Sequence, residues 1–124
     1  MSRTPTLLSI IELGGYPSFT PLYERAGYAV TAVVSVRKAL GLLKTSQPDV
    51  VVAEFNYQSD FRDRTSSLES LLAVVQRSPQ TRVIVFYEKE YEHQFDKLRA
   101  RFPLYAALSY PIAPETLAQY LRQP

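Results

Sequence analysis

Two spacings of hydrophobic residues alternate along the chain. Consecutive apolar and β-branched residues predict five buried strands, at residues 6–13, 28–34, 50–53, 82–87 and 105–109. Apolar residues that recur every three or four positions predict a helix after each strand, beginning near Phe19, Ser35, Ser66, Tyr91 and Pro114. Strands and helices therefore alternate along the whole chain.

Capping and turn residues mark the ends of the predicted helices. Ser35 is a suitable N-cap, Ser66 and Glu69 have the spacing of a capping box, and Pro114 fits the first turn of the last helix. Gly27 and Pro79 are placed to end the first and third helices. These residues support the same order of elements as the hydrophobic spacing.

The predicted strands are apolar on both faces, which is typical of a parallel sheet covered by helices on both sides. Right-handed crossovers then predict an α/β fold, a three-layer, doubly wound, flavodoxin-like (βα)5 sandwich with a five-stranded parallel sheet. In this architecture ligands bind beyond the carboxyl ends of the strands, near the point where the winding reverses.

Composition narrows the class of protein. With 124 residues, 46% of them apolar and 21% charged, the chain fits one globular domain over residues 1–124, with a core over about 6–122. A net charge of +2 gives no basis for direct nucleic-acid binding. There is no cysteine, which excludes disulfides and thiolate metal ligands. Since no apolar run reaches the roughly 18 residues of a membrane span, we expect a cytoplasmic protein without a membrane partner.

Carboxylates and phenols stand at the carboxyl ends of the predicted strands. Glu12 follows the first strand, Glu54 the third, Tyr87 and Glu88 the fourth, and Tyr110 the fifth. Because parallel strands end at the same edge of a sheet, we expect these side chains to converge there.

Three segments resemble the response-regulator receiver (CheY-like) family of two-component signalling. They are the second helix with the third strand, the fourth strand, and the fifth strand with its turn, "VRKALGLLKTSQPDVVVAE", "RVIVFYE" and "ALSYPI". The resemblance extends over residues 6–122 and implies that Glu54 occupies the position of the phosphate-accepting aspartate. It also implies signalling through protein contact.

The residues that the family uses for phosphorylation are mostly replaced. Glu12 is followed by Leu13, so one carboxylate of the Mg²⁺-binding acidic pair is missing. Glu54 replaces the aspartate, and its extra methylene displaces the carboxylate oxygens. Tyr87 stands in place of a small hydroxyl, and Tyr110 in place of the lysine that balances the phosphoryl charge. The resemblance therefore implies a pseudo-receiver without catalytic residues, metal or cofactor.

Four interpretations of Glu54 remain open at this point. It is an ordinary solvated charge at a strand end, a carboxylate that holds the domain in one fixed state as an aspartyl phosphate would, a metal ligand together with Glu12 and Glu88, or a working phosphoacceptor.

An alternative function is a sensor that binds a small anion or nucleotide at the carboxyl edge of the sheet. Gly14 and Gly15 follow a strand and offer backbone groups to a phosphate, while Arg62 and Arg64 lie in a long loop and offer charge. His93, the only histidine, has no partner at ligand spacing, so we expect a surface residue.

Tyrosines concentrate in the last third of the chain. Tyr91, Tyr105, Tyr110 and Tyr120 belong to the fourth helix, the fifth strand and the fifth helix, which in receivers form the usual dimer and output surface. Tyrosine suits protein interfaces, and it also packs small cores. We therefore predict a non-enzymatic, receiver-like module that contacts a protein partner or a second copy of itself through this surface.

Overall fold

A computed structural model describes residues 4–10, 19–55, 67–78 and 80–122. Strands and helices alternate in it in the predicted order: β1 Thr6–Ile10, α1 Thr20–Arg25, β2 Ala29–Val33, α2 Val36–Leu43, β3 Val50–Glu54, α4 Ser67–Val75, β4 Arg82–Tyr87, the 3₁₀ turn η1 Lys89–Tyr91, α5 Glu92–Arg99, β5 Ala106–Ser109 and α6 Pro114–Leu121.

The five strands form one parallel sheet in the order β2-β1-β3-β4-β5. The winding reverses beside β1, which lies between β2 and β3, so the carboxyl ends of β1 and β3 flank the point where this architecture places its ligands. At the opposite edge, the backbone N–H of Thr6 donates to Oδ2 of Asp49 over 2.7 Å and ties β1 to the entry of β3. The doubly wound (βα)5 sandwich predicted from the sequence is confirmed.

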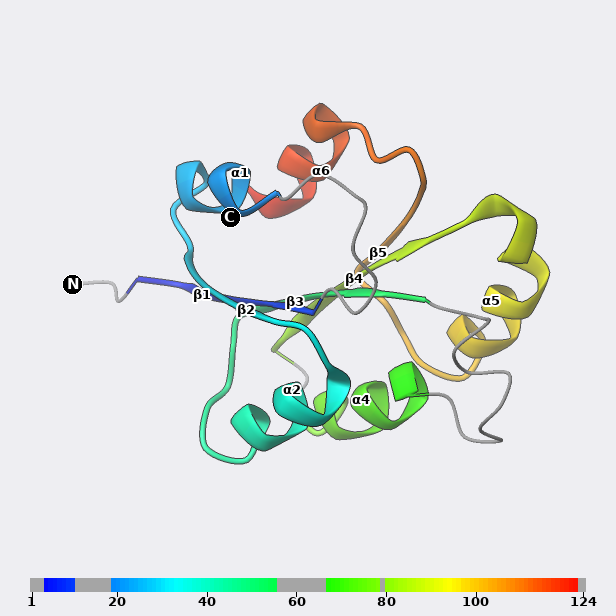
Figure 1. Cartoon of the computed structure of the whole chain (residues 1–124), viewed down its shortest axis with the longest axis horizontal. Helices are drawn as coiled ribbons and strands as arrows, with labels where there is room; N and C mark the ends of the chain where they lie inside the picture. The colour runs from blue at the N-terminus through cyan, green and yellow to red at the C-terminus, as the bar shows by residue number, and fades with distance from the viewer. Residues whose placement is uncertain (1–3, 11–18, 56–66, 79, 123–124) are drawn as a thin grey trace.

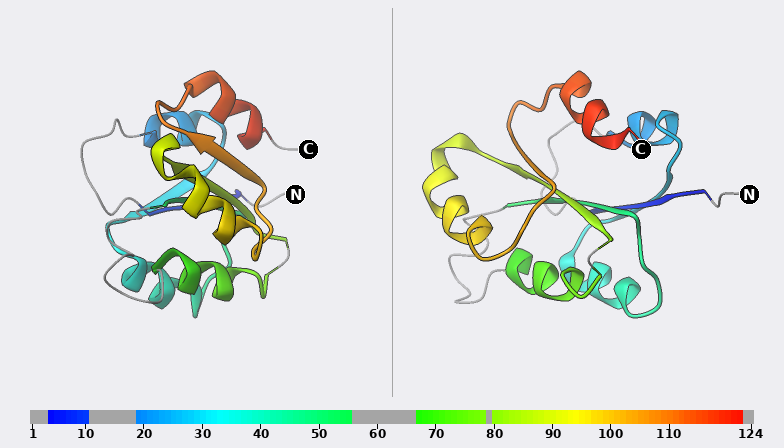
Figure 2. Two further views of the ribbon diagram at one scale, coloured as in Figure 1. Left: turned by 90° about the vertical axis from the view of Figure 1, so that its right-hand side faces the viewer. Right: turned by 180° about the vertical axis from the view of Figure 1, so that it is seen from behind.

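Helices cover both faces of the sheet (Figure 1). On one face, α1 and α6 pack on alternate strand residues through Tyr23, Leu117 and Leu121. On the other face, α2, α4 and α5 pack on the intervening strand residues. Views from the side and from behind show the same three layers (Figure 2). Because neighbouring residues of a strand point to opposite faces, each strand contributes to two separate cores.

The edge strand β2 departs from the prediction that every strand is buried on both faces. Three of its five residues are exposed, and Val34 directly after it is 67% exposed. The strand order explains the difference, because β2 pairs with β1 alone and has no neighbour on its outer side. An apolar, β-branched run predicts a strand but does not say whether it lies at the centre or the edge of the sheet.

The predicted caps are confirmed where the structure describes them. The Ser35 hydroxyl accepts a hydrogen bond from the backbone N–H of Lys38 over 3.2 Å, and Gly27 ends α1 with a φ of 99°. Pro114 begins α6. The fourth predicted helix begins with the short η1 turn before α5. The end of the first predicted strand beyond Ile10, and Ser66 of the predicted capping box, lie outside the described residues.

Candidate functional site

Glu54 lies at the carboxyl end of β3, at the centre of the sheet. It is paired in register with Phe86 of β4, so both side chains point to the face that α1 and α6 cover. The side chain is buried, with only 5% of the residue exposed. The interpretation of Glu54 as a solvated charge at a strand end is therefore wrong. At the end of this central strand, Glu54 is paired with β4 and buried.

A phenol reaches this buried carboxylate from the end of β5. The Tyr110 hydroxyl donates a hydrogen bond to Oε2 of Glu54 over 2.9 Å, between residues 56 positions apart. The Tyr110 ring lies edge-on to Phe86, with centroids 5.9 Å apart, and its backbone N–H donates to the carbonyl of Tyr87 over 2.9 Å. We call Tyr110 and Glu54 the buried pair. Its two members come together as the strand ends predicted.

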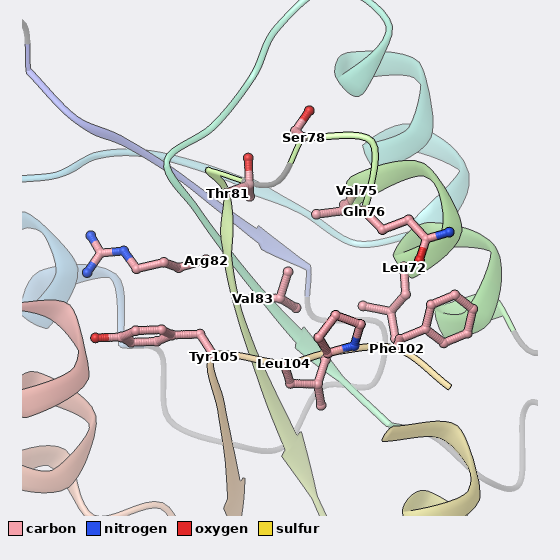
Figure 3. A pocket seen from close by; sticks show the side chains of 11 residues that line it. Leu72, Val75, Gln76, Ser78, Thr81, Arg82, Val83, Phe102, Leu104 and Tyr105 are labelled. Atoms are coloured by element: carbon pink, nitrogen blue, oxygen red, sulfur yellow. The ribbon is translucent and has the colours of Figure 1, made fainter. Parts of the chain in front are cut away.

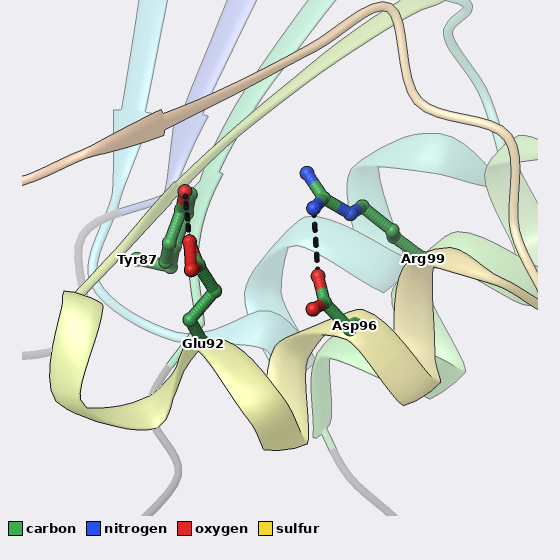
Figure 4. Close-up of polar contacts among 4 residues, drawn as sticks. All are labelled: Tyr87, Glu92, Asp96 and Arg99. Carbon is green, nitrogen blue, oxygen red and sulfur yellow. Dashed lines mark hydrogen bonds and ion pairs between the residues drawn. The ribbon is translucent and has the colours of Figure 1, made fainter.

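Tyr87 does not point to Glu54. Its hydroxyl donates to Oε2 of Glu92 over 3.2 Å (Figure 4). Its ring stacks on Phe95 with centroids 4.6 Å apart. Because Tyr87 directly follows Phe86 in β4, it faces the opposite layer of the molecule. We call Tyr87 and Glu92 the surface pair, since Glu92 is exposed.

The environment of Tyr87 favours its neutral form. Desolvation of the ring and the neighbouring Glu92 carboxylate raise the pKa of Tyr87 above its usual value. Elsewhere on α5, Arg99 forms an ion pair with Asp96 over 2.7 Å, between two largely exposed side chains (Figure 4). Glu92 was not predicted as a partner of Tyr87. The five-residue spacing across the strand-to-helix turn is the only signal for it, and that signal is weak.

Several predicted site residues lie outside the described residues. They are Glu12 and Leu13 of the degenerate acidic pair, and Gly14, Gly15, Arg62 and Arg64 of the proposed ligand loops. The expectation of no metal at this edge, the alternative reading of Glu54 as a metal ligand and the alternative of an anion site therefore all stay untested. Among the described residues, no three histidine, aspartate or glutamate side chains are grouped to hold a metal ion, and no helix there is long and apolar enough to span a membrane. His93 is exposed on α5, as predicted.

The predicted tyrosine surface is uneven. Tyr105 is 47% exposed and lies edge-on to Tyr120 with ring centroids 5.9 Å apart. The Arg82 guanidinium lies 5.3 Å from the centroid of the Tyr105 ring and donates a 2.8 Å hydrogen bond to the Tyr28 hydroxyl. Tyr91, Tyr110 and Tyr120 are half-buried against the two cores. Tyr105 is thus the tyrosine of this set with the most surface available to a partner.

Solved structures of receiver domains have a fold similar to that of this chain. No protein-family model matches the sequence, and no curated protein matches it. Among solved structures, a response regulator receiver domain from Clostridium thermocellum is 16% identical, with a TM-score of 0.69, over 94% of this chain and 90% of that chain. The chemotaxis protein CheY4 of Vibrio cholerae is 20% identical, with a TM-score of 0.71, over 96% of this chain and 97% of that chain.

A third similar structure comes from a family described as redox sensors of streptococci that evolved from two-component response regulators. It is 15% identical, with a TM-score of 0.66, over 93% of this chain and 48% of that chain. Together these likenesses show that the chain has the fold of CheY-like receiver domains over nearly its whole length. The fold implied by the sequence resemblance is confirmed.

Proposed function

We propose that this chain is a receiver-like signalling module that acts through protein contact and does not accept a phosphoryl group at Glu54. The observation that carries the proposal is the buried pair. The resemblance to receivers implies an aspartate and a lysine at these two positions. In this chain a glutamate occupies the first and accepts a hydrogen bond from the tyrosine at the second.

The chemistry of the buried pair argues against phosphoryl transfer. A protonated phenol carries no positive charge, so Tyr110 does not neutralise the charge that develops on a transferred phosphoryl group. Glu54 is also 5% exposed, and a phosphodonor must reach its oxygens in line with the leaving group. A hydrogen bond that already occupies Oε2 adds to the energy needed to free that oxygen.

A fixed carboxylate favours a fixed signalling state. Tyr110 and Glu54 link the ends of β5 and β3 without a phosphate, in an arrangement that no modification needs to complete. Of the readings of Glu54, the one in which its carboxylate holds the domain in a single state agrees best with this contact. The proposed module therefore presents a preformed surface to its partner.

The proposed contact surface is formed by α5, β5 and α6. Tyr105 supplies an exposed aromatic ring, and Arg82 lies over that ring, with its guanidinium held by Tyr28. Aromatic and arginine side chains are enriched where protein interfaces have most of their binding energy. Thiol oxidation is not available as the signal, since the chain has no cysteine.

The test compares oligomeric state and partner binding with and without a phosphodonor. Light scattering of the protein, alone and with acetyl phosphate and Mg²⁺, should give the same mass. Tyr105→Ala should weaken self-association or the binding of a partner isolated with the parent protein. Val34→Ala, which truncates an exposed apolar residue beside the edge strand, is the matched control and should change neither. A mass that changes with phosphodonor, or equal effects of the two variants, would contradict the proposal.

A further inference from the structure

The amino ends of β4 and β5, opposite the buried pair, border an apolar cavity of about 330 Å³ (Figure 3). Leu72, Val83 and Leu104 are among its apolar lining residues. Arg82 belongs to the same lining, but its side chain points away from the cavity and lies over the Tyr105 ring. This cavity offers apolar surface without a charge to orient a ligand.

A second groove lies next to it, between the carboxyl-terminal halves of α2 and α4. Its volume is about 470 Å³, within the range typical of small-molecule sites. Its apolar lining comes from both helices: Leu40, Leu43, Val74 and Val75. Two hydrogen bonds of 2.8 Å tie the loops below it together, from Nε2 of Gln47 to Oγ of Ser78 and from Oγ1 of Thr81 to the carbonyl of Pro48.

Two cations stand among the residues that line this groove. Lys44 follows α2, Arg77 follows α4, and both are exposed. Neither side chain forms a salt bridge within the part of the chain that the structure describes. The segment 35–48 around α2 has three cationic residues and no acidic one, and the acidic Glu69 of α4 is itself paired with Arg101 over 2.6 Å. The charged residues that line the groove are therefore both cationic.

We propose that the groove binds a single-chain amphiphilic anion, with an apolar tail along the leucine and valine side chains and a carboxylate or phosphate head beside Lys44 and Arg77. An apolar surface favours a hydrocarbon chain, and two cations that form no salt bridge with any described carboxylate favour an anionic head. The groove is concave and of limited volume, which suits one free chain rather than the surface of a bilayer. The site is separate from the buried pair and does not depend on the proposed function.

Decanoate, kept below its micelle-forming concentration, is the probe. Calorimetric titration of the intact chain should show saturable binding of decanoate, and a thermal melt should show a rise in melting temperature that grows with its concentration. Decyltrimethylammonium has the same tail with a cationic head, and acetate has the same head without the tail. Both should bind more weakly than decanoate, because the first lacks the anionic head and the second lacks the apolar tail.

Substitutions of residues that line the groove test the site itself. The double variant Lys44→Gln, Arg77→Gln should weaken decanoate binding by roughly tenfold, since each exposed ion pair contributes modestly. Lys38→Gln on the same helix removes a cation that does not line the groove and should leave the affinity unchanged. Val74→Phe should reduce binding by filling the groove.

Three results would overturn the proposal. They are the absence of saturable decanoate binding, equal binding of the cationic analogue, and full affinity in the double variant. Binding to anionic lipid vesicles without binding to free decanoate would instead assign the two cations to a membrane surface, and would equally contradict a site for a free amphiphile.

Discussion

Two tyrosine–glutamate hydrogen bonds lie at the same edge of the sheet, on opposite faces. In the buried pair, Tyr110 donates over 2.9 Å to a carboxylate that is 5% exposed and 56 residues away in the sequence. In the surface pair, Tyr87 donates over 3.2 Å to an exposed carboxylate five residues away. The chemical groups are the same, but their surroundings differ.

The two pairs differ in which member is the more buried: the tyrosine ring in the surface pair, and the carboxylate in the buried pair. Tyr87 has the more buried ring, at 8% exposure and stacked on Phe95, while its carboxylate partner is in solvent. Tyr110 has a half-buried ring and a buried carboxylate partner. Ring packing should therefore dominate the contribution of Tyr87 to stability, and the hydroxyl should dominate that of Tyr110.

Removal of the whole ring should give the largest effect. Tyr87→Ala should lower the free energy of unfolding by about 3–5 kcal/mol, as expected for loss of a buried aromatic side chain. Tyr110→Ala should cost less from packing, because its ring is half-buried. Urea unfolding followed by circular dichroism measures both. A larger loss for Tyr110→Ala would mean that the buried pair contributes more than the packing of either ring.

Removal of the hydroxyl alone should reverse this order. Tyr110→Phe should lower the free energy of unfolding by about 1–3 kcal/mol, because a buried carboxylate loses a donor. Tyr87→Phe should change it by less than about 1 kcal/mol, because water replaces the phenol at exposed Glu92. The same urea titrations provide the measurement. Equal effects of the two Phe variants would remove the distinction between the pairs.

Alkaline pH should lower the free energy of unfolding by a smaller amount, through the buried phenols. The pKa of Tyr87 is raised in the fold by desolvation and by Glu92, and burial also raises the pKa of Tyr23. The neutral phenols are favoured in the folded state, so their contribution is complete below the unfolded pKa of about 10 and is lost as pH rises through the folded values. Stability should fall above about pH 10.

The Phe variants identify the source of this pH dependence. Tyr87→Phe and Tyr23→Phe should each make the decline of unfolding free energy above about pH 10 less steep, because each removes one phenol that the fold keeps protonated. Unfolding titrations at a series of pH values provide the slopes. Slopes unchanged in both variants would show that other groups cause the alkaline loss.

The sequence was sufficient to predict the fold and the meeting of Glu54 with Tyr110. Parallel strands end at one edge of a sheet, so side chains at the carboxyl ends of β3 and β5 are expected to converge there. Three features needed the structure. The burial of Glu54 depends on its central position in the sheet, the exposure of β2 depends on its edge position, and the direction of Tyr87 depends on the strand register.

For the tyrosines too, the sequence does not predict which side chains are exposed. A count of tyrosines predicts aromatic surface or aromatic core without distinguishing them. Tyr105 is largely exposed, while Tyr91, Tyr110 and Tyr120 pack partly against the cores. Helix and strand spacing locates each residue on an element, but exposure depends on which neighbouring element covers it.

The intact mass of the protein after incubation with acetyl phosphate and Mg²⁺ tests the central claim most directly. A receiver domain with a phosphorylatable aspartate, treated in parallel, shows that the donor is active. We predict that the mass of this chain stays unchanged, because Glu54 is buried and accepts a hydrogen bond from Tyr110, which occupies the position that the resemblance assigns to lysine. Stoichiometric gain of one phosphoryl group that is lost in Glu54→Ala would contradict the account.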